Sequence, residues 1–334
     1  MIIPEYWAQG RVQQRVRGRQ VTMRRFGWSD MSQLDAQAMA DARAHEAMAQ
    51  VLAGVPQPGF ERKVAYNGAD GVPIREEVLQ RAGPEVVTRN SYGAHCLNTP
   101  RALFADVDYE QPRYTSGWGK VYLVAIALAA GLAFAAVQRV AGTGFGVAAA
   151  LVASLVALVV VSSLQGRAEA RARAVAAPGI QQQALQRVQD FAAAHPDWSL
   201  RLYQTPAGMR VLATHRPFDP LEPEVQRFFD AIGVDRLYAR MCRNQRCFRA
   251  RLTGKPWRMD IAEHMRPRPG VWPINPERLP EREAWVARYE QRSAGYAACR
   301  FVQALGPERT DAAIAGVVAL HDDLSKANRS LPLA

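Results

Sequence analysis

The sequence predicts an α+β protein whose mixed or antiparallel sheet, with flanking helices, is interrupted by a two-helix transmembrane hairpin. Two uncharged apolar runs, at 121–137 and 145–164, lie near the middle of the chain. On either side, strand-like segments alternate with segments that repeat apolar residues at helical spacing. We therefore divide the chain into an N-terminal part at 1–117, the hairpin at 118–166 and a C-terminal part at 167–334, which completes the α+β domain.

The two apolar runs predict membrane-spanning helices. A helix needs about 20 apolar residues to cross the bilayer core, with a lower limit of about 17. The connection at 138–144 is too short for a folded domain, so the helices should be antiparallel. Lys120 precedes the hairpin, and Arg167, Arg171 and Arg173 follow it. By the positive-inside rule both termini face the cytoplasm of a bacterial-type inner (plasma) membrane, with the lipid bilayer as partner. The alternative is an alanine-rich helix pair buried in a soluble bundle.

The N-terminal part is expected to hold a basic arm, helices and strands. Residues 1–28 are basic with scattered aromatic residues, typical of a solvated face that could also lie on lipid head groups. Asp30 is in position to cap the helix that follows it. The expected elements are a strand at 19–26, helices at 31–52 and 73–82, and extended segments at 86–92 and 102–108.

The C-terminal part is expected to supply the partner strands. Two strand-like segments joined by Pro206-Ala207-Gly208 form a hairpin pattern. We expect one central sheet that brings 86–108 beside 199–215 and 247–252. The expected elements are helices at 165–176, 180–194, 222–232, 235–243, 280–291 and 311–328, strands at 199–205, 209–215, 247–252 and 298–304, and an irregular proline-rich stretch at 266–280.

The net charge and the cysteine content indicate which partners and which redox compartment suit the protein. The net charge of +11 belongs partly to the membrane flanks, and the rest suits anionic lipid head groups, nucleic acid or nucleotides. The four cysteines are sparse, and in a reducing cytoplasm we expect free thiols. Cys242 and Cys247 have a C-x4-C spacing without a second pair, so a zinc site is the less favoured interpretation.

Asp106 and Asp108 are the strongest candidates for chemistry. Side chains two residues apart on a strand point to the same face, so both carboxylates should project together from a strand end. Two convergent carboxylates are costly to bury without a cation, and Mg²⁺ or Mn²⁺ with a phosphate is the usual solution. The alternative is a solvated strand end.

Further candidates follow the hairpin. His215 ends an apolar strand, where it is either structural or a donor to a phosphate. Arg249 and Arg251 share one face of a predicted strand, and Lys255 lies shortly after it. This basic row suits phosphate oxygens, and its alternative is the polar outer face of a half-buried strand.

Taken in order, these motifs resemble the catalytic core of the archaeo-eukaryotic primase (primase-polymerase) superfamily. That family has an apolar strand with Asp-x-Asp, then a small residue-x-His, then an apolar stretch ending in an acid. The matching segments are 104–108, 213–215 and 257–260, so the resemblance spans about residues 85–262, and the apolar hairpin lies between the first two motifs.

The resemblance implies metal-dependent nucleotide or nucleic-acid processing. Asp106, Asp108 and Asp260 would hold the divalent metal, and His215 would contact the phosphates of the incoming nucleotide. Asp219 is a rival for the third acid. Arg249, Arg251 and Lys255 are phosphate-binding candidates from the strand pattern alone.

Two other functions fit the same sequence. A membrane-tethered glycosyltransferase also uses Asp-x-Asp with a metal and a nucleotide diphosphate, but residues 1–100 lack the βαβ start that it requires. A non-catalytic membrane-anchored scaffold or binding module needs no special motif. Whether the protein is an enzyme is therefore left open by the sequence.

Overall fold

The computed structural model describes residues 1–61, 73–109, 118–268, 270 and 272–334. The chain separates into two compact units, one formed by 1–108 with 186–334 and the other by 109–185. The parts before and after the apolar hairpin thus share one unit. Antiparallel sheets and helices confirm the predicted α+β class.

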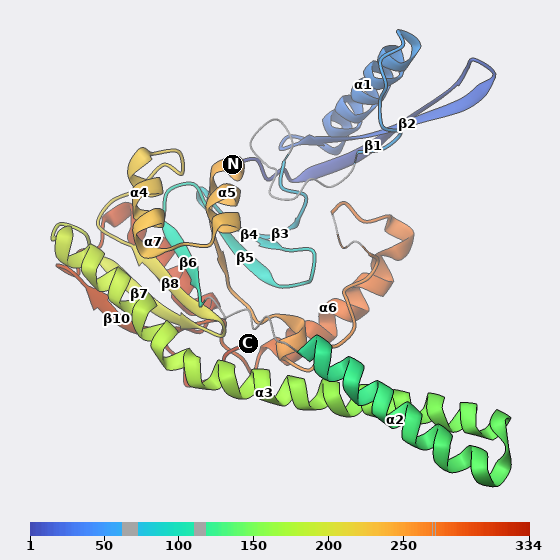
Figure 1. Ribbon diagram of the computed structural model, residues 1–334. Helices are drawn as coiled ribbons and strands as arrows, with labels where there is room; N and C mark the ends of the chain where they lie inside the picture. The colour runs from blue at the N-terminus through green and yellow to red at the C-terminus, as the bar shows by residue number, and fades with distance from the viewer. Residues whose placement is uncertain (62–72, 110–117, 269, 271) are drawn as a thin grey trace. The chain divides into compact units, whose positions relative to one another are not determined.

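Two four-stranded antiparallel sheets carry the core of the first unit (Figure 1). The order β10-β7-β8-β6 comprises Arg300–Leu305, Leu200–Thr205, Gly208–Ala213 and Phe104–Asp108. The order β3-β4-β5-β9 comprises Glu77–Ala82, Glu85–Arg89, His95–Thr99 and Phe248–Arg251.

Each sheet joins strands from before and after the apolar hairpin. β6 pairs with β8, so that Phe104 lies opposite Leu212, and β5 pairs with β9, so that Leu97 lies opposite Ala250. The prediction of a single central sheet was wrong. The chain turns after β5, where Thr99 Oγ1 accepts bonds from the Arg101 and Ala102 amides, and β6 then joins the other sheet.

The predicted helix at 73–82 was also wrong. Its second half is β3, which pairs with β4 across a tight turn between Ala82 and Glu85. Gly83 in that turn has a φ of +63°, a conformation that glycine adopts without strain. Pairing with β4 therefore overrides the local helical preference of this segment.

The N-terminal residues form a β-ribbon covered on one face by a helix (Figure 1). β1 (Tyr6–Val16) and β2 (Arg19–Ser29) pair along their whole length, and α1 (Gln33–Leu52) packs on them. A Cβ on Gly10 or Gly27 would overlap the α1 backbone, so glycine permits the close approach. The helix predicted at 31–52 is confirmed, but Ser32, and not Asp30, accepts the capping bond from the Asp35 amide.

The remaining helices of this unit lie near their predicted positions. In α4, Val225, Phe228, Phe229 and Ile232 are buried at helical spacing, which explains why this segment folds as a surface helix. The helices are α4 (Pro223–Ile232), α5 (Arg236–Gln245), α6 (Leu279–Ser293) and α7 (Ala312–Leu324), with 3-10 turns at Pro256–Arg258 and Pro276–Arg278.

The second unit is an antiparallel pair of apolar helices, each long and apolar enough to cross a membrane. α2 (Trp118–Ala141) and α3 (Thr143–Ala194) are separated by Gly142 alone, which has a φ of +86°. The predicted connection at 138–144 is therefore mostly helical. α3 continues through Pro178, so the helices predicted at 165–176 and 180–194 are one helix.

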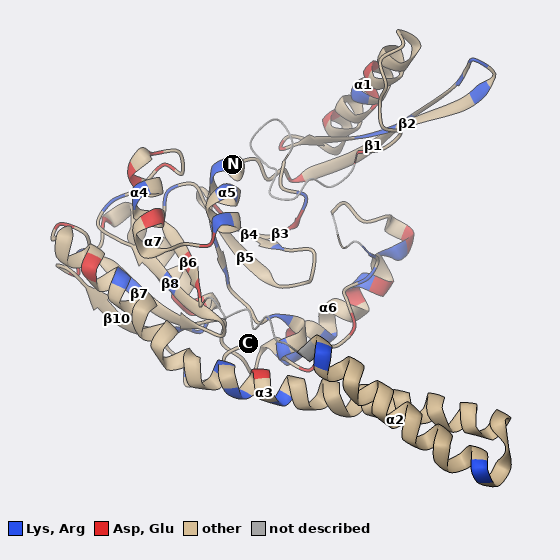
Figure 2. Ribbon diagram, in the orientation of Figure 1, with Lys and Arg blue, Asp and Glu red and all other residues tan. Residues whose placement is uncertain are grey.

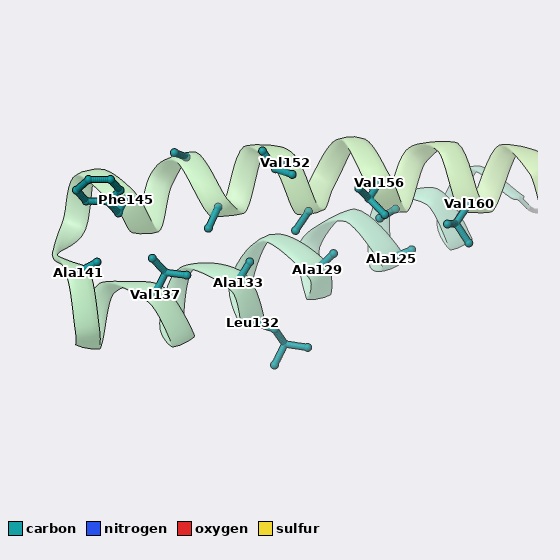
Figure 3. Close-up of a pocket in the computed structure, with 15 residues that line it drawn as sticks. Ala125, Ala129, Leu132, Ala133, Val137, Ala141, Phe145, Val152, Val156 and Val160 are labelled. Atoms are coloured by element: carbon teal, nitrogen blue, oxygen red, sulfur yellow. The ribbon is translucent and has the colours of Figure 1, made fainter.

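The facing sides of α2 and α3 are lined by small and β-branched residues. Figure 3 shows Ala125, Ala129 and Ala133 of α2 opposite Val152 and Val156 of α3. At the other end of this pair, the Tyr122 hydroxyl donates to Gln165 Oε1 at 2.8 Å. The outward side chains are exposed, including Leu132 at 71% and Leu151 at 68%.

Candidate functional site

A cavity of about 580 Å³ lies in the first unit and is lined by strands of both sheets and by α5. Five of the seven residues that the sequence singled out for chemistry line it: Asp106, Asp108, Arg249, Arg251 and Lys255. Arg210, Asp235, Tyr238 and Arg258 complete its polar wall. His215 and Asp260 are not among the lining residues. Pairing of β6 with β8 and of β5 with β9 is what brings the two halves of the candidate site together.

Asp106 is held by a buried arginine. Arg210 lies directly opposite it on β8, with Nε 2.8 Å from Oδ1 and Nη2 3.2 Å from Oδ2. The Arg210 side chain is 2% exposed and that of Asp106 is 32% exposed. Arg210 Nη1 also donates to the Arg251 carbonyl at 2.9 Å. Both oxygens of Asp106 are thus engaged by one guanidinium, which ties β8 to β9.

A buried histidine stands behind this pair. His321 Nε2 lies 3.3 Å from Arg210 Nη1, and Nδ1 lies 2.9 Å from Asp322 Oδ1. With Arg210 as donor and Asp322 as acceptor, the ring is neutral and carries its proton on Nδ1. Burial lowers the pKa of His321, and the bond to Asp322 only partly opposes this. The histidine, which does not line the cavity, therefore helps to hold Arg210 in place.

Asp108 lies at the rim of the cavity with its carboxyl group partly desolvated. Desolvation raises its pKa, and the charges of Asp106 and Asp235 act in the same direction. Lys255 and Arg258 oppose the shift. Asp235 itself caps α5 by accepting from the Tyr238 amide at 2.8 Å. Asp108 therefore protonates more readily than an ordinary aspartate.

Arg251, Lys255 and Arg258 form a cationic trio in the cavity wall. Burial lowers the pKa of Lys255, and the neighbouring charges of Arg251 and Arg258 lower it further. Burial also lowers the pKa of Arg258, with Arg251 again contributing. Arg251 donates to the backbone oxygens of Thr253 and Ala334, each at 3.0 Å. Within the described part of the chain, no member of the trio forms an ion pair with an aspartate or glutamate side chain.

Arg249 differs from the trio because it already has an acidic partner. Its Nη2 lies 2.6 Å from Glu76 Oε2, and the two side chains are 11% and 9% exposed. Glu76 also accepts from Thr88 Oγ1 at 2.7 Å. Glu76 neutralises the charge of Arg249 in this buried pair. The trio is therefore better placed than Arg249 to bind an anion.

His215 and Asp260 lie in other environments. His215 Nδ1 accepts from the Ser199 amide at 3.3 Å, and its ring packs on Trp198 and Phe218 with centroids 4.8 and 5.3 Å away. Asp260 is 76% exposed and pairs with Arg292 at 2.8 Å. Asp219, the rival third acid, accepts from the Leu221 amide in its own turn.

The residues present do not fit a three-carboxylate metal site. Among the described residues, no three His, Cys, Asp or Glu side chains are grouped so that they could hold a metal ion. Asp106 is occupied by Arg210, and Asp260 does not line the cavity. The four cysteines are free thiols, as the sequence predicted, and all four are buried.

An aromatic pair borders the cationic trio. Tyr92 lines the cavity, and its ring centroid lies 5.5 Å from that of Trp257, which is 56% exposed. Lys255 Nζ lies 5.5 Å from the Trp257 centroid. Burial raises the pKa of Tyr92 to about 12, so its hydroxyl stays protonated. A partly exposed tryptophan ring thus lies beside the cations of the cavity.

Sequence patterns alone did not reveal Arg210 or His321 as parts or supports of this site. The one available signal was an arginine inside the apolar stretch Met209-Arg210-Val211, because such a residue needs a buried partner. Comparisons with protein-family models, curated proteins and solved structures found no match to the chain. Its function is therefore argued from the site itself.

Proposed function

We propose that the protein is a membrane-anchored α+β protein that binds a phosphorylated ligand of nucleotide type in the cavity. The observation that carries this proposal is the cationic trio, whose charges repel one another and which forms no ion pair with an aspartate or glutamate side chain among the described residues. Guanidinium and ammonium groups form strong charge-assisted bonds with phosphate oxygens. A cavity of about 580 Å³ is also of the size that small-molecule ligands occupy.

The aromatic pair supports a nucleotide over inorganic phosphate. Trp257 exposes much of its ring next to Lys255. Stacking of a base on an aromatic side chain is worth about 1–3 kcal/mol and accepts any base. A ligand with phosphates on the trio and a base on Trp257 would use both features.

Primase-polymerase-type chemistry with Mg²⁺ or Mn²⁺ stays a prediction. Among the described residues Asp108 forms no ion pair, whereas Asp106 would have to be shared with Arg210. No catalytic step is assigned to His215, since its ring nitrogen Nδ1 already accepts from Ser199. The non-catalytic binding module is the alternative, and it requires only that the ligand bind.

The membrane anchor is supported by α2 and α3. Their outward apolar side chains would be costly to expose to water, at roughly 25 cal/mol per Å². Pairing of β6 with β8 supports one compartment for both flanks of the hairpin. Arg167, Arg171 and Arg173 follow the apolar part of α3, which favours the cytoplasm as that compartment and an inner membrane as the anchor.

Binding can be tested on the full-length protein in detergent. We expect ADP and ATP to quench tryptophan fluorescence and tripolyphosphate to compete with them. Lys255→Gln with Arg258→Gln should weaken binding more than tenfold, because each charge-assisted bond is worth roughly 1.5–3 kcal/mol. Arg300→Gln, an exposed arginine of β10, is the matched control. Absence of binding with and without Mg²⁺ would leave the scaffold as the remaining function.

The anchor can be tested by labelling single cysteines with a membrane-impermeant maleimide. Cysteines at Gly142, between α2 and α3, and at Arg17 should react from opposite sides of an inner-membrane preparation. The native cysteines are buried and should stay unlabelled. Labelling of both positions from the same side would contradict the transmembrane hairpin.

A further inference from the structure

The β1–β2 ribbon has one covered face and one open face. Met23 and the glycines at 10 and 27 belong to the face that packs on α1. Because successive strand residues point to opposite faces, the other face carries Arg11, Gln13 and Arg15 of β1 and the alternate residues of β2. These three residues are exposed.

The open face is basic along its outer half. Arg11 lies directly opposite Arg24, and Arg15 lies opposite Gln20. Arg17 and Arg19 extend the charge around the tip, where Arg17 and Gly18 have positive φ values of 48° and 78°. We call Arg11, Arg15, Arg17, Arg19 and Arg24 the ribbon arginines. Figure 2 shows blue segments along this ribbon and at its tip.

Nothing in the ribbon neutralises these charges. Residues 6–29 contain no aspartate or glutamate. All five ribbon arginines are exposed, and none of them forms an ion pair with a carboxylate in the part of the chain that the structure describes. Like charges directly opposite each other destabilise a strand pair, as at Arg11 and Arg24. A bound polyanion would relieve this repulsion between the arginines, and the relief would favour binding.

The composition of the face favours duplex DNA over a bilayer. Gln13, Gln20 and Thr22 lie between the arginines and can donate to and accept from base edges. No large apolar side chain between residues 11 and 24 is strongly exposed, whereas membrane-surface elements present such side chains beside basic ones.

The dimensions of the ribbon also select B-form DNA. Two paired strands lie about 4.8 Å apart, and the B-DNA major groove, about 12 Å wide, admits a two-stranded ribbon. The major groove of A-form RNA is too narrow for side-chain readout.

We propose that the open face of the β1–β2 ribbon is a docking surface for duplex DNA, with the ribbon arginines on phosphates and the polar residues between them toward the groove. The proposal is independent of the ligand in the cavity, because no residue of the ribbon lines that cavity. It adds a second anionic partner of a different size and shape.

The test uses the full-length protein in nanodiscs of neutral lipid, titrated with a labelled 20-base-pair duplex at several salt concentrations. Up to five phosphate contacts predict that log affinity falls with log salt at a slope of up to about −4.5. Arg11→Gln with Arg24→Gln should flatten the slope by about 2 and weaken binding about tenfold or more at 0.1 M salt. Circular dichroism of the variant should match wild type, since the change removes a repulsion.

A matched control carries the same change in charge elsewhere. Arg187→Gln with Arg227→Gln alters two exposed arginines of α3 and α4 and should leave DNA binding unchanged. Equal loss in the two double variants, or no DNA binding by wild type, would overturn the proposal.

Protection from trypsin digestion shows whether DNA or lipid binds the open face of the ribbon. DNA should protect the bonds after Arg15, Arg17 and Arg19. Protection by nanodiscs rich in phosphatidylglycerol, with none by DNA, would instead assign the face to the membrane surface and overturn the DNA proposal.

Discussion

Arg210 is the residue on which the polar wall of the cavity depends. Its guanidinium bonds to Asp106 on β6, to the carbonyl of Arg251 at the end of β9 and to His321 on α7. An arginine that is 2% exposed is stable only when its donors are bonded. The same contacts engage both carboxylate oxygens of Asp106.

Replacing Arg210 by methionine should therefore destabilise the protein. The variant leaves the partly buried Asp106 carboxylate without its partner, and we expect the free energy of unfolding to fall by about 3 kcal/mol. Chemical denaturation in detergent measures this. Adding Asp106→Leu should recover most of the loss, because the unpaired charge is then gone. A double variant as unstable as the single one would contradict this account.

Asp108 should make anion binding depend on pH. Its pKa is raised, so as the pH falls through that value the carboxylate is neutralised and stops repelling a bound phosphate. Affinity for ADP without metal should rise, and Asp108→Asn should show the higher affinity already at neutral pH. We expect roughly a fivefold gain, on the order of 1 kcal/mol.

Comparing wild type and variant across pH cancels the titration of the ligand itself. If Mg²⁺ is present and Asp108→Asn binds less tightly than wild type, Asp108 acts as a metal ligand, as the resemblance implies. A pH dependence identical in both proteins would exclude Asp108 as its source.

The two buried histidines should make the fold sensitive to acid. Burial lowers the pKa of both His215 and His321 in the folded protein. The unfolded chain then binds more protons than the folded one as the pH drops below about 6.5, so stability falls there. Denaturation at pH 8 and pH 5 measures the loss. His321→Gln should show less of it, whereas Arg187→Gln should behave as wild type.

At the level of residues, the sequence predicted the acids of the site better than their partners. The alternation of side chains along one strand predicted that Asp106 and Asp108 share a face, and both residues line the cavity. Arg210 and His321 depend on the register of β6 against β8 and on the packing of α7, which local patterns do not contain. His215 was predicted to end its strand, but β8 ends two residues earlier at Ala213, and aromatic neighbours surround the histidine ring.

At the level of elements, helices and hairpins with strong local signals were predictable. The β7–β8 hairpin and α1 formed where periodicity and turn residues indicated. β5 and β1 were not predicted, and β3 was taken for a helix, because their pairing partners decide their conformation. Non-local pairing is the information that single segments lack.

The contact between the ribbon and α1 gives an element-level prediction. A methyl group at Gly27 would collide with the α1 backbone at Ala36 and Ala40. Gly27→Ala should lower the melting temperature and speed trypsin cleavage in the ribbon, at a cost of about 1–3 kcal/mol. Gly295→Ala, at a site with room for a Cβ, is the control and should behave as wild type. Equal stability of the two variants would show that α1 can move away from the ribbon at little cost.

At the scale of the whole molecule, the apolar pair α2–α3 is inserted between strands that pair with one another. The sequence predicted one sheet built from both flanks, whereas the structure divides these strands between two sheets. That division follows from the turn between β5 and β6, where the Thr99 hydroxyl redirects the chain. A chain that stops after α3 lacks β7, β8 and β9, so residues 77–108 should then be readily digested by trypsin while α2–α3 stays in the membrane fraction. Protection of residues 77–108 in that truncated chain would contradict the pairing.

The pairing of β6 with β8 sets the order of events during synthesis. Asp108 leaves the ribosome 100 residues ahead of its partner Gly208, which at 5–20 residues per second is a delay of roughly 5–20 s. During that interval the early strands expose unpaired edges. We expect a nascent-chain chaperone to bind these edges and prevent aggregation. On the proposal that α2–α3 spans a membrane, incorrect insertion of the hairpin would leave the strands on opposite sides of the bilayer, and neither sheet could close. Closure of the two sheets would then report that insertion succeeded.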